Sequence, residues 1–188
     1  MKNVILTHIN DLLKVKPFIL AAIDGRCASG KSTLASELEK ELDCNVIHMD
    51  DFFLRPEQRT EKRLGIPGEN IDHERFLSEV LIPLRRGENF IYRPFRCHEG
   101  NFGEPIEVKH KKVTVIEGSY SLHNLLREHY DLRIFCDTDY ATQLERIRIR
   151  NGDIGLERFK NMWIPLEEKY FATGIKEICH IVTGGKKE

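Results

Sequence analysis

The sequence lacks the marks of a secreted or membrane-spanning protein. Its five cysteines are an odd number without paired spacing, which argues against a disulfide framework and favours a reducing compartment, the cytoplasm. No apolar run approaches the roughly 20 residues that are needed to cross a bilayer. Residues 7–11 are mainly polar and interrupt the apolar N-terminal residues, so a signal peptide is not predicted either.

The chain also lacks an excess of charge of one sign. Lysine and arginine number 29 and aspartate and glutamate 30, and neither end carries a long block of like charge. A basic stripe or tail marks many nucleic-acid-binding surfaces, so no nucleic-acid partner is predicted. A chain of 188 residues can bury a stable core without disulfides or structural metals, and we predict one domain over residues 1–188.

Apolar runs alternate with amphipathic stretches along the chain. Strands are predicted at residues 17–23, 45–49, 113–116, 132–137 and 178–182, and helices at 3–15, 31–42, 72–86, 122–129 and 140–150. Residues 54–70 combine charge with proline and glycine, as an exposed functional loop does, and residues 89–110 favour a small hairpin region. The alternation predicts an α/β fold with a doubly wound parallel sheet, whose ligands bind beyond the carboxyl ends of the strands.

A glycine-rich turn directly follows the first predicted strand. It fits the phosphate-binding-loop pattern G-x-x-x-x-G-K-[S/T] with Gly25, Arg26, Cys27, Ala28, Ser29, Gly30, Lys31 and Ser32. The two glycines let backbone N–H groups turn inward around a phosphate, at the positive end of the following helix. Lys31 can reach the β- and γ-phosphates of ATP, the Ser32 hydroxyl can bind Mg²⁺, and Thr33 is expected to contact the phosphates.

The same eight residues could also form an ordinary glycine-containing helix start with an incidental lysine. The apolar strand before them and the amphipathic helix after them favour nucleotide binding, because this is the context that the motif requires. Within the loop, Cys27 is expected to serve as a small tolerated side chain rather than as a redox sensor or nucleophile.

Acidic residues follow two further predicted strands. Asp50 and Asp51 end the second strand at the edge of the sheet where the loop emerges, and Glu117 ends the third. We predict that Asp50 accepts the proton of an attacking hydroxyl and contacts Mg²⁺ through water, with Asp51 in a capping or supporting position. Glu117 is expected to bind Mg²⁺ through water. The alternatives are a helix N-cap for the aspartates and a structural ion pair for Glu117.

Taken together, the phosphate loop and three short motifs resemble the uridine kinases over most of the chain. The motifs occur in the family's order: residues 50–53 (DDFF), 70–73 (NIDH) and 116–118 (IEG). This resemblance implies a three-layer α/β/α P-loop NTPase fold similar to nucleoside monophosphate kinases, and γ-phosphoryl transfer to an alcohol. The wider group includes pantothenate kinase, phosphoribulokinase and nicotinamide riboside kinase. The resemblance also implies that Asp50 is the base, and it is compatible with self-association.

The resemblance places the acceptor site within about residues 54–110. Asp72 falls where uridine kinases hold ribose hydroxyls, although an aspartate before a helix can equally be its N-cap. Tyr92 and His98 fall where the family contacts the base; a strand aromatic and a loop histidine are the alternatives. Arg93, with Arg96, would equally suit a phosphorylated or carboxylated acceptor.

Residues 145–150 resemble the arginine-bearing lid of these kinases, which we place at about residues 146–160. Arg146 and Arg150 share a helix face and are predicted to stabilise charge on the transferring phosphoryl group, while Arg148 and Arg158 are also candidates. A solvated helix face with local ion pairs is the alternative.

The sequence thus predicts an ATP- and Mg²⁺-dependent kinase that phosphorylates a hydroxyl of a small metabolite, first of all a nucleoside. Pantothenate, nicotinamide riboside and a sugar phosphate remain alternative acceptors, and the motifs do not separate ATP from GTP. The rival from another class is a regulatory nucleotide-binding module. The guanine-switch patterns N-K-x-D and D-x-x-G are absent from the sequence, which counts against a switch of that type.

Overall fold

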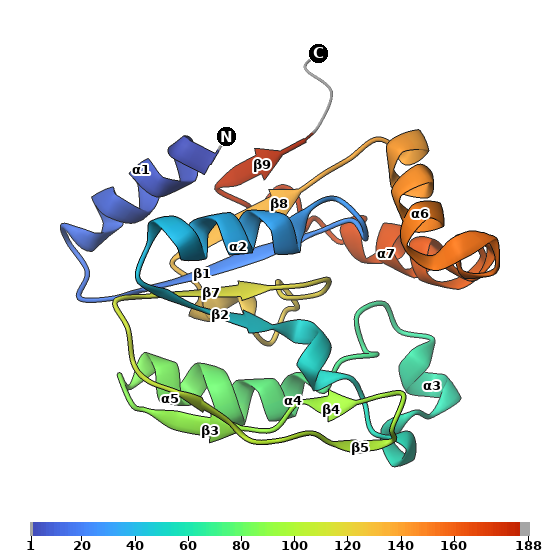
Figure 1. The fold of residues 1–188 in the computed structure, drawn as a ribbon, viewed down its shortest axis with the longest axis horizontal. Coiled ribbons are helices and arrows are strands. Elements are labelled where there is room, and N and C mark those ends of the chain that lie inside the picture. The colour runs from blue at the N-terminus through green and yellow to red at the C-terminus, as the bar shows by residue number, and fades with distance from the viewer. Residues whose placement is uncertain (1, 185–188) are drawn as a thin grey trace.

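The centre of the computed structural model, which describes residues 2–184, is a parallel sheet in the order β2-β7-β1-β8-β9 (Figure 1). Its strands are β1 (Ile19–Gly25), β2 (Cys44–His48), β7 (Val113–Glu117), β8 (Leu132–Cys136) and β9 (Ile181–Thr183). Every pairing in this sheet is parallel. The predicted parallel sheet is confirmed, although β9 begins three residues later than expected.

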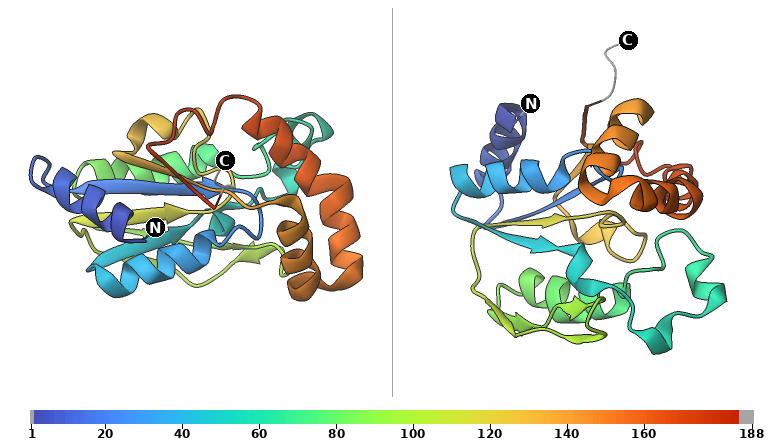
Figure 2. Two further views of the ribbon diagram at one scale, coloured as in Figure 1. Left: turned by 90° about the horizontal axis from the view of Figure 1, so that it is seen from above. Right: turned by 45° about the vertical axis from the view of Figure 1, so that its right-hand side comes forward.

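Both faces of the sheet are covered, and β1 shows why. All of its residues are buried, with Ala21 and Ile23 in one hydrophobic cluster and Leu20 and Ala22 in the other. The first cluster is completed by α1 (Lys2–Leu13) and α2 (Lys31–Glu41), which lie together on one side of the sheet (Figures 1 and 2). A strand buried on both faces needs a continuous apolar run, as the sequence has here.

The opposite face is covered by one long helical stretch and by the turns after β7. The helical stretch consists of α4 (His73–Phe76), the π-helical segment η3 (Leu77–Leu81) and α5 (Ile82–Arg85). Pro83 lacks a backbone N–H and so interrupts the regular hydrogen-bonding pattern of this stretch. Phe76, Val80 and Leu84 point into the core against the sheet.

The prediction of a helix at residues 122–129 is wrong. Only the short 3₁₀ segment η4 (Arg127–His129) forms there, and the preceding residues are turns. The reason is local competition for backbone donors. The Asp24 carboxylate accepts the Leu122 N–H at 2.9 Å, and the His123 ring accepts the Leu125 N–H at 3.4 Å. Side chains that capture N–H groups in this way favour turns over a helix.

Residues 49–64 and 90–108 contribute short elements beside the sheet. They are the 3₁₀ segments η1 (Met49–Phe52) and η2 (Pro56–Gln58), α3 (Glu61–Leu64), and strands β3 (Phe90–Tyr92), β4 (Phe95–Arg96), β5 (Asn101–Phe102) and β6 (Ile106–Val108). β3 pairs with β6 and β4 with β5, both antiparallel, as the predicted hairpin region requires.

Past β8 the chain forms a helical pair beside the carboxyl ends of the strands (Figure 1). It consists of α6 (Tyr140–Arg158), the π-helical segment η5 (Phe159–Trp163) and α7 (Ile164–Phe171). α6 is longer than the predicted helix at 140–150 and has a sharp break at Gly152, whose φ of 69° is outside the helical range. None of the helices within residues 2–184 is long and apolar enough to span a membrane.

Candidate functional site

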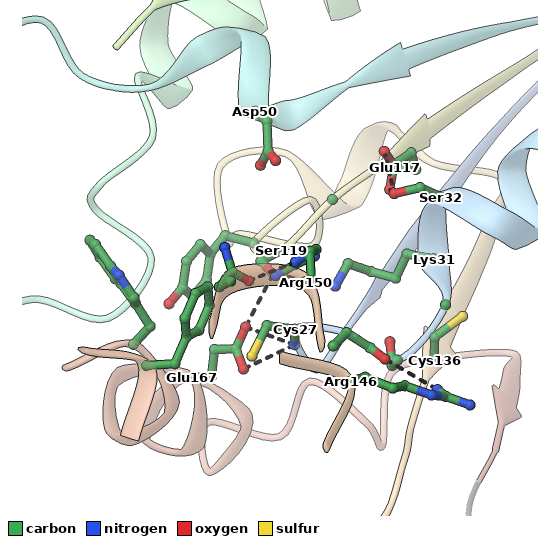
Figure 3. A pocket seen from close by; sticks show the side chains of 18 of the residues that line it. Cys27, Lys31, Ser32, Asp50, Glu117, Ser119, Cys136, Arg146, Arg150 and Glu167 are labelled. Atoms are coloured by element: carbon green, nitrogen blue, oxygen red, sulfur yellow. Dashed lines mark hydrogen bonds between the residues drawn. The ribbon is translucent and has the colours of Figure 1, made fainter. Parts of the chain in front are cut away.

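A cleft of about 1450 Å³ opens at the carboxyl ends of the strands (Figure 3). The phosphate loop and the residues after β7 and β8 form its floor, Asp50 enters from the end of β2, and the α6–α7 pair forms one wall. Ligands of open parallel sheets bind at this edge. Small-molecule pockets usually measure about 300–1000 Å³, so the cleft has room for a nucleotide and a second small molecule.

The phosphate loop owes its shape to two glycines. Gly25 has a φ of 136°, and a Cβ atom there would lie 2.0 Å from the carbonyl oxygen of Cys136, so only glycine fits between β1 and β8. Gly30 has a φ of 98° and directly precedes α2, whose first N–H groups face the loop. Residues 27–33 of the predicted site line the cleft, whereas Gly25 and Arg26 lie behind it.

Lys31 begins α2 and folds back over the loop. Its ammonium Nζ donates to the carbonyl oxygens of Gly25 at 2.9 Å and Arg26 at 2.8 Å. It also lies 3.4 Å from the hydroxyl oxygen of Ser119 in the turn after β7. The side chain lines the cleft although it is only 8% exposed, so its charge is concentrated at the loop.

Ser32 and Glu117 meet at one side of the cleft. The Ser32 hydroxyl donates to the Glu117 carboxylate, with both oxygens at 3.2 Å, and Nδ1 of His48 lies 2.5 Å from Oε1 of the same carboxylate. The pKa of His48 is raised, chiefly by this hydrogen bond. The contact between His48 and Glu117 was not predicted, because the sequence indicates only that His48 lies in a strand.

A serine hydroxyl beside one carboxylate suits Mg²⁺ chemically. Mg²⁺ is usually held by one or two protein oxygens together with substrate phosphates and water, not by a cage of side chains. Within residues 2–184 there is no group of three or more His, Cys, Asp or Glu side chains that could hold a metal on its own. The oxygen donors present therefore fit an ion brought in with a nucleotide.

The two aspartates of η1 point in different directions. Asp50 extends into the cleft above Lys31 (Figure 3). Its carboxylate is in contact with solvent but deep in the cleft, and the loss of hydration, followed by the negative charge of Glu117, raises its pKa. Asp51 instead turns away and accepts a hydrogen bond of 3.0 Å from the Tyr92 hydroxyl. Its supporting position was predicted, but its partner was not.

Three residues predicted for the acceptor do not line this cleft. Asp72 is 3% exposed and caps α4, accepting the Arg75 N–H at 3.1 Å and the Gln58 amide at 2.8 Å. Its alternative interpretation as an N-cap is thus realised in the structure. Tyr92 is buried against Asp51, and Nε of Arg93 donates to a backbone carbonyl. Contact of these three with a substrate stays a prediction.

The side of the cleft nearest the predicted acceptor region is lined by other side chains. His98 is there, as predicted, and it is joined by Phe53, Arg59 and Cys97. Nε of Arg59 donates to the Leu54 carbonyl oxygen at 2.9 Å, which holds the arginine at the cleft. Arg59 was missed because residues 54–70 appeared in the sequence only as a charged loop.

The candidate lid arginines separate into two groups. Arg146, Arg150 and Arg158 line the cleft, and Nη1 of Arg146 donates to the Ala28 carbonyl oxygen in the phosphate loop at 3.1 Å. Arg148 lies elsewhere, at a shallow depression formed with Leu144, Glu145 and Leu156. The two arginines predicted to share a helix face thus both line the cleft, and of the two further candidates Arg158 lines it and Arg148 does not.

Two buried acids near the loop were missed as site residues. Asp24, fully buried, accepts four hydrogen bonds, from the N–H groups of Gly25, Tyr120 and Leu122 and from the Tyr170 hydroxyl. Its position at the end of an apolar run was the available signal. Glu167, in α7, accepts from the loop itself, and the charged sequence around it carries no such signal.

The characterised proteins that resemble this sequence include two with similar identity. The chain is 32% identical over 146 residues to uridine-cytidine kinase B of Dictyostelium discoideum, covering 72% of this chain and 58% of that protein. It is 33% identical over 146 residues to the uridine kinase of Clostridium novyi (strain NT), covering 71% of this chain and 68% of that protein. The chain thus spans about three fifths to two thirds of these relatives, and no family model matches it.

Solved structures share the fold at low sequence identity. A possible uridine kinase from Bacillus stearothermophilus superposes with a TM-score of 0.71 and 18% identity, covering 94% of this chain and 95% of that one. A proposed P-loop kinase with a circular permutation from Saccharomyces cerevisiae gives a TM-score of 0.69 and 14% identity, covering 99% of both chains. The predicted three-layer α/β/α P-loop fold is confirmed.

Proposed function

Because the chain belongs to the uridine kinase family, as its 33% identity across 68% of the Clostridium novyi protein shows, we propose that it phosphorylates a hydroxyl group of a nucleoside with ATP. The observation that carries this proposal is the meeting of Lys31, Ser32, Asp50 and Glu117 at one cleft, from the ends of three adjacent strands. A phosphate-binding loop alone occurs in nucleotide-binding proteins of many functions. The Asp50 carboxylate, which faces the loop from the end of β2, adds a group that can act on an acceptor hydroxyl.

The donor half binds the phosphates of ATP. Backbone N–H groups of the loop and the start of α2 surround them, and Lys31 turns its ammonium from the loop carbonyls to the β- and γ-phosphates. Ser32 and Glu117 would hold Mg²⁺ with their hydroxyl and carboxylate oxygens. When bound, Mg²⁺ supplies positive charge that offsets the charge of the phosphates.

The acceptor half presents the hydroxyl to the γ-phosphorus. Asp50 accepts the hydroxyl proton while the acceptor oxygen bonds to phosphorus and the bond from phosphorus to the β,γ-bridging oxygen breaks, which releases ADP. Because the Asp50 pKa is raised, the carboxylate is a better proton acceptor than an ordinary aspartate. Arg146, Arg150 and Arg158 stabilise the negative charge on the phosphoryl group during its transfer.

We further propose that the chain forms a single domain and acts in the cytoplasm. Different segments of this domain have different roles. Residues of about 54–110 supply the acceptor site and residues of about 146–160 the lid. The break at Gly152, with its φ of 69°, lies within the lid and is a natural point for it to bend.

The test is ADP release from purified protein across a panel of nucleosides, vitamins and sugars, with Lys31→Ala as the inactive control. We expect acceptor-stimulated ADP release with at least one nucleoside and its loss in Lys31→Ala. A regulatory nucleotide-binding module would instead hydrolyse ATP slowly at a rate that no acceptor changes, and that result would overturn the proposal.

A second candidate acceptor class is favoured by Arg59. This side chain lines the cleft, and no carboxylate within residues 2–184 lies within 4 Å of it. Five other arginines of residues 54–110 have carboxylate partners: Arg55, Arg63, Arg75, Arg85 and Arg96. Arg86 and Arg93 have none in the described part of the chain, but they do not line the cleft. A guanidinium without a carboxylate partner suits a carboxylate or phosphate on the acceptor.

The two candidates are separated by comparing neutral and anionic acceptors with the Arg59→Ala variant. If the acceptor is anionic, kcat/KM for it falls by at least about tenfold in Arg59→Ala, the loss expected for one charge-assisted hydrogen bond. Arg55→Ala, which removes a half-buried arginine that is paired with Glu57 and does not line the cleft, serves as the control. Equal effects of Arg59→Ala on neutral and anionic acceptors would exclude the second candidate.

A further inference from the structure

α7 contacts the phosphate loop through a buried carboxylate. Both oxygens of Glu167 accept the N–H of Cys27, the third residue of the loop, at 3.0 and 3.1 Å (Figure 3). Glu167 is 3% exposed, and no lysine or arginine within residues 2–184 pairs with it at 4 Å or less. A buried carboxylate without an ion-pair partner is costly, so its hydrogen bonds have to hold it in place.

The same carboxylate reaches Lys31 through one intermediary. The Ser119 hydroxyl donates to Oε1 of Glu167 at 3.2 Å, and Nζ of Lys31 lies 3.4 Å from the Ser119 oxygen. Glu167 is therefore joined to the loop in two ways, directly at the Cys27 backbone and indirectly at the lysine (Figure 3). Its burial raises the pKa of Glu167, and the charge of Lys31 opposes that rise.

One turn further along α7, a second contact secures the helix. Tyr170 lies on the same face as Glu167, and its hydroxyl donates to Asp24 at 2.8 Å. Asp24 in turn accepts the Gly25 N–H, at the first position of the loop, at 2.7 Å. α7 thus contacts the third residue of the loop directly and the first through Asp24. η5 connects α7 to α6, which carries the arginines.

We propose that Glu167 is a positioning residue, which fixes the conformation of the phosphate loop and the direction of Lys31 through Cys27 and Ser119. The inference rests on the proposed role of this loop in holding the phosphates of ATP. Because α7 continues from the lid, the residue also ties the base of the lid to the nucleotide phosphates. We expect the effect to be confined to the phosphates, because Glu167 lines the cleft beside the phosphate loop and its hydrogen bonds there are to Cys27 and Ser119.

Glu167→Gln tests the proposal with minimal change of shape. The amide keeps one acceptor oxygen where the carboxylate has two. If that oxygen takes the place of Oε1, the NH₂ group faces the Cys27 N–H, and if it takes the place of Oε2, Ser119 can no longer donate to it; the negative charge beside the loop is removed in both cases. We expect the dissociation constant for ADP, measured by calorimetry with Mg²⁺, to rise about tenfold. Glu168→Gln is the matched control: Glu168 is the next residue of α7, is half-exposed, pairs with the Arg26 side chain, and is expected to leave ADP affinity unchanged.

A purely structural role would lower the melting temperature of Glu167→Gln and leave its affinity for ADP unaltered, and that outcome would overturn the proposal. An equal loss of affinity in Glu168→Gln would also overturn it. If Glu167→Gln does not fold, Ser119→Ala decides, because it removes only the link between Glu167 and Lys31: a weaker affinity for ADP supports the proposal and an unchanged one contradicts it.

The measurement does not depend on the acceptor. A wild-type protein that binds ADP tightly but phosphorylates no acceptor would contradict the proposed function and leave the role of Glu167 intact. Conversely, an active kinase in which Glu167→Gln binds ADP normally keeps the proposed function and removes this inference.

Discussion

The hydroxyl oxygen of Ser32 lies 3.2 Å from both carboxylate oxygens of Glu117, although 85 positions separate the two residues in the chain. The contact exists because β7 lies beside β1, which brings the end of β7 next to the first turn of α2. A hydroxyl and a carboxylate at this distance can share one bound Mg²⁺ with its water.

We therefore predict that Glu117→Gln raises the Mg²⁺ concentration needed for half-maximal activity. Removing the negative charge weakens attraction for the ion by about tenfold or more, the scale found for changes to the groups that support a bound metal. Titrating MgCl₂ at saturating ATP measures the change. Chelation by EDTA should abolish turnover of the wild type, and full activity in EDTA would contradict the assignment.

The raised pKa of Asp50 gives the reaction a characteristic pH dependence. The base must be deprotonated to accept a proton, so kcat/KM falls as the pH drops through the pKa of Asp50 in the folded protein. That pKa lies above its ordinary value of 3.8, because the site is poorly hydrated and Glu117 is negative, so the fall begins at a higher pH than for a free aspartate.

Asp50→Asn is expected to lower kcat by about 10²–10⁴-fold, the usual contribution of a general base. The acidic limb of the pH profile that belongs to Asp50 should vanish in the same variant. Asp51→Asn provides the comparison, since Asp51 faces Tyr92 and not the cleft. A variant at position 50 with nearly normal turnover would show that another group accepts the proton.

The arginines of α6 should differ in their effect on catalysis. Arg146→Ala removes a cation that lines the cleft and contacts the phosphate loop, and we expect kcat to fall by about 10²-fold or more, as for other groups that stabilise transition-state charge. Arg148→Ala removes a cation outside the cleft on the same helix and should leave kcat within a factor of two or so of the wild type. Steady-state rates at saturating ATP distinguish the two.

Gly25 and Gly30 offer a matched pair for stability. In Gly25→Ala the new methyl group would lie 2.0 Å from the Cys136 carbonyl oxygen, between two central strands, and we expect the free energy of unfolding to fall by about 3 kcal/mol or more. Gly30→Ala meets no atom within 4 Å and suffers only backbone strain, about 1–2 kcal/mol. Urea denaturation measures the free energy of unfolding of both variants. Equal losses of stability would contradict the prediction, because they would mean that the backbone shifts to relieve the contact with Cys136.

Local patterns were sufficient to predict most strands and the phosphate loop. β1 and β7 are fully buried, so their sequences are mainly apolar, and each strand ends in functional residues: Gly25 after Asp24 in β1, and Glu117 in β7. The helix expected at residues 122–129 failed for a reason outside that segment. The acceptor of the Leu122 N–H is Asp24, about 100 residues earlier, which no local pattern can reveal.

The acceptor site was predicted less completely because its side chains have more than one use. An aspartate before a helix, such as Asp72, can cap it or bind a ligand, and the sequence is the same in both cases. Glu167 shows the opposite limit: it lies in a charged stretch, and its burial depends on how α7 packs against the loop. For both residues, the role is set by tertiary contacts that the local sequence does not show.

The strand order also dictates when this protein can complete its fold. β7 lies between β1 and β2, yet it follows β2 in the chain by more than sixty residues. A nascent chain that has only reached residue 110 therefore holds β1 and β2 without the strand that joins them, and exposed strand edges of this kind favour aggregation. The sheet closes only once β7 has been synthesised and inserted, and such long-range parallel pairing favours slow folding.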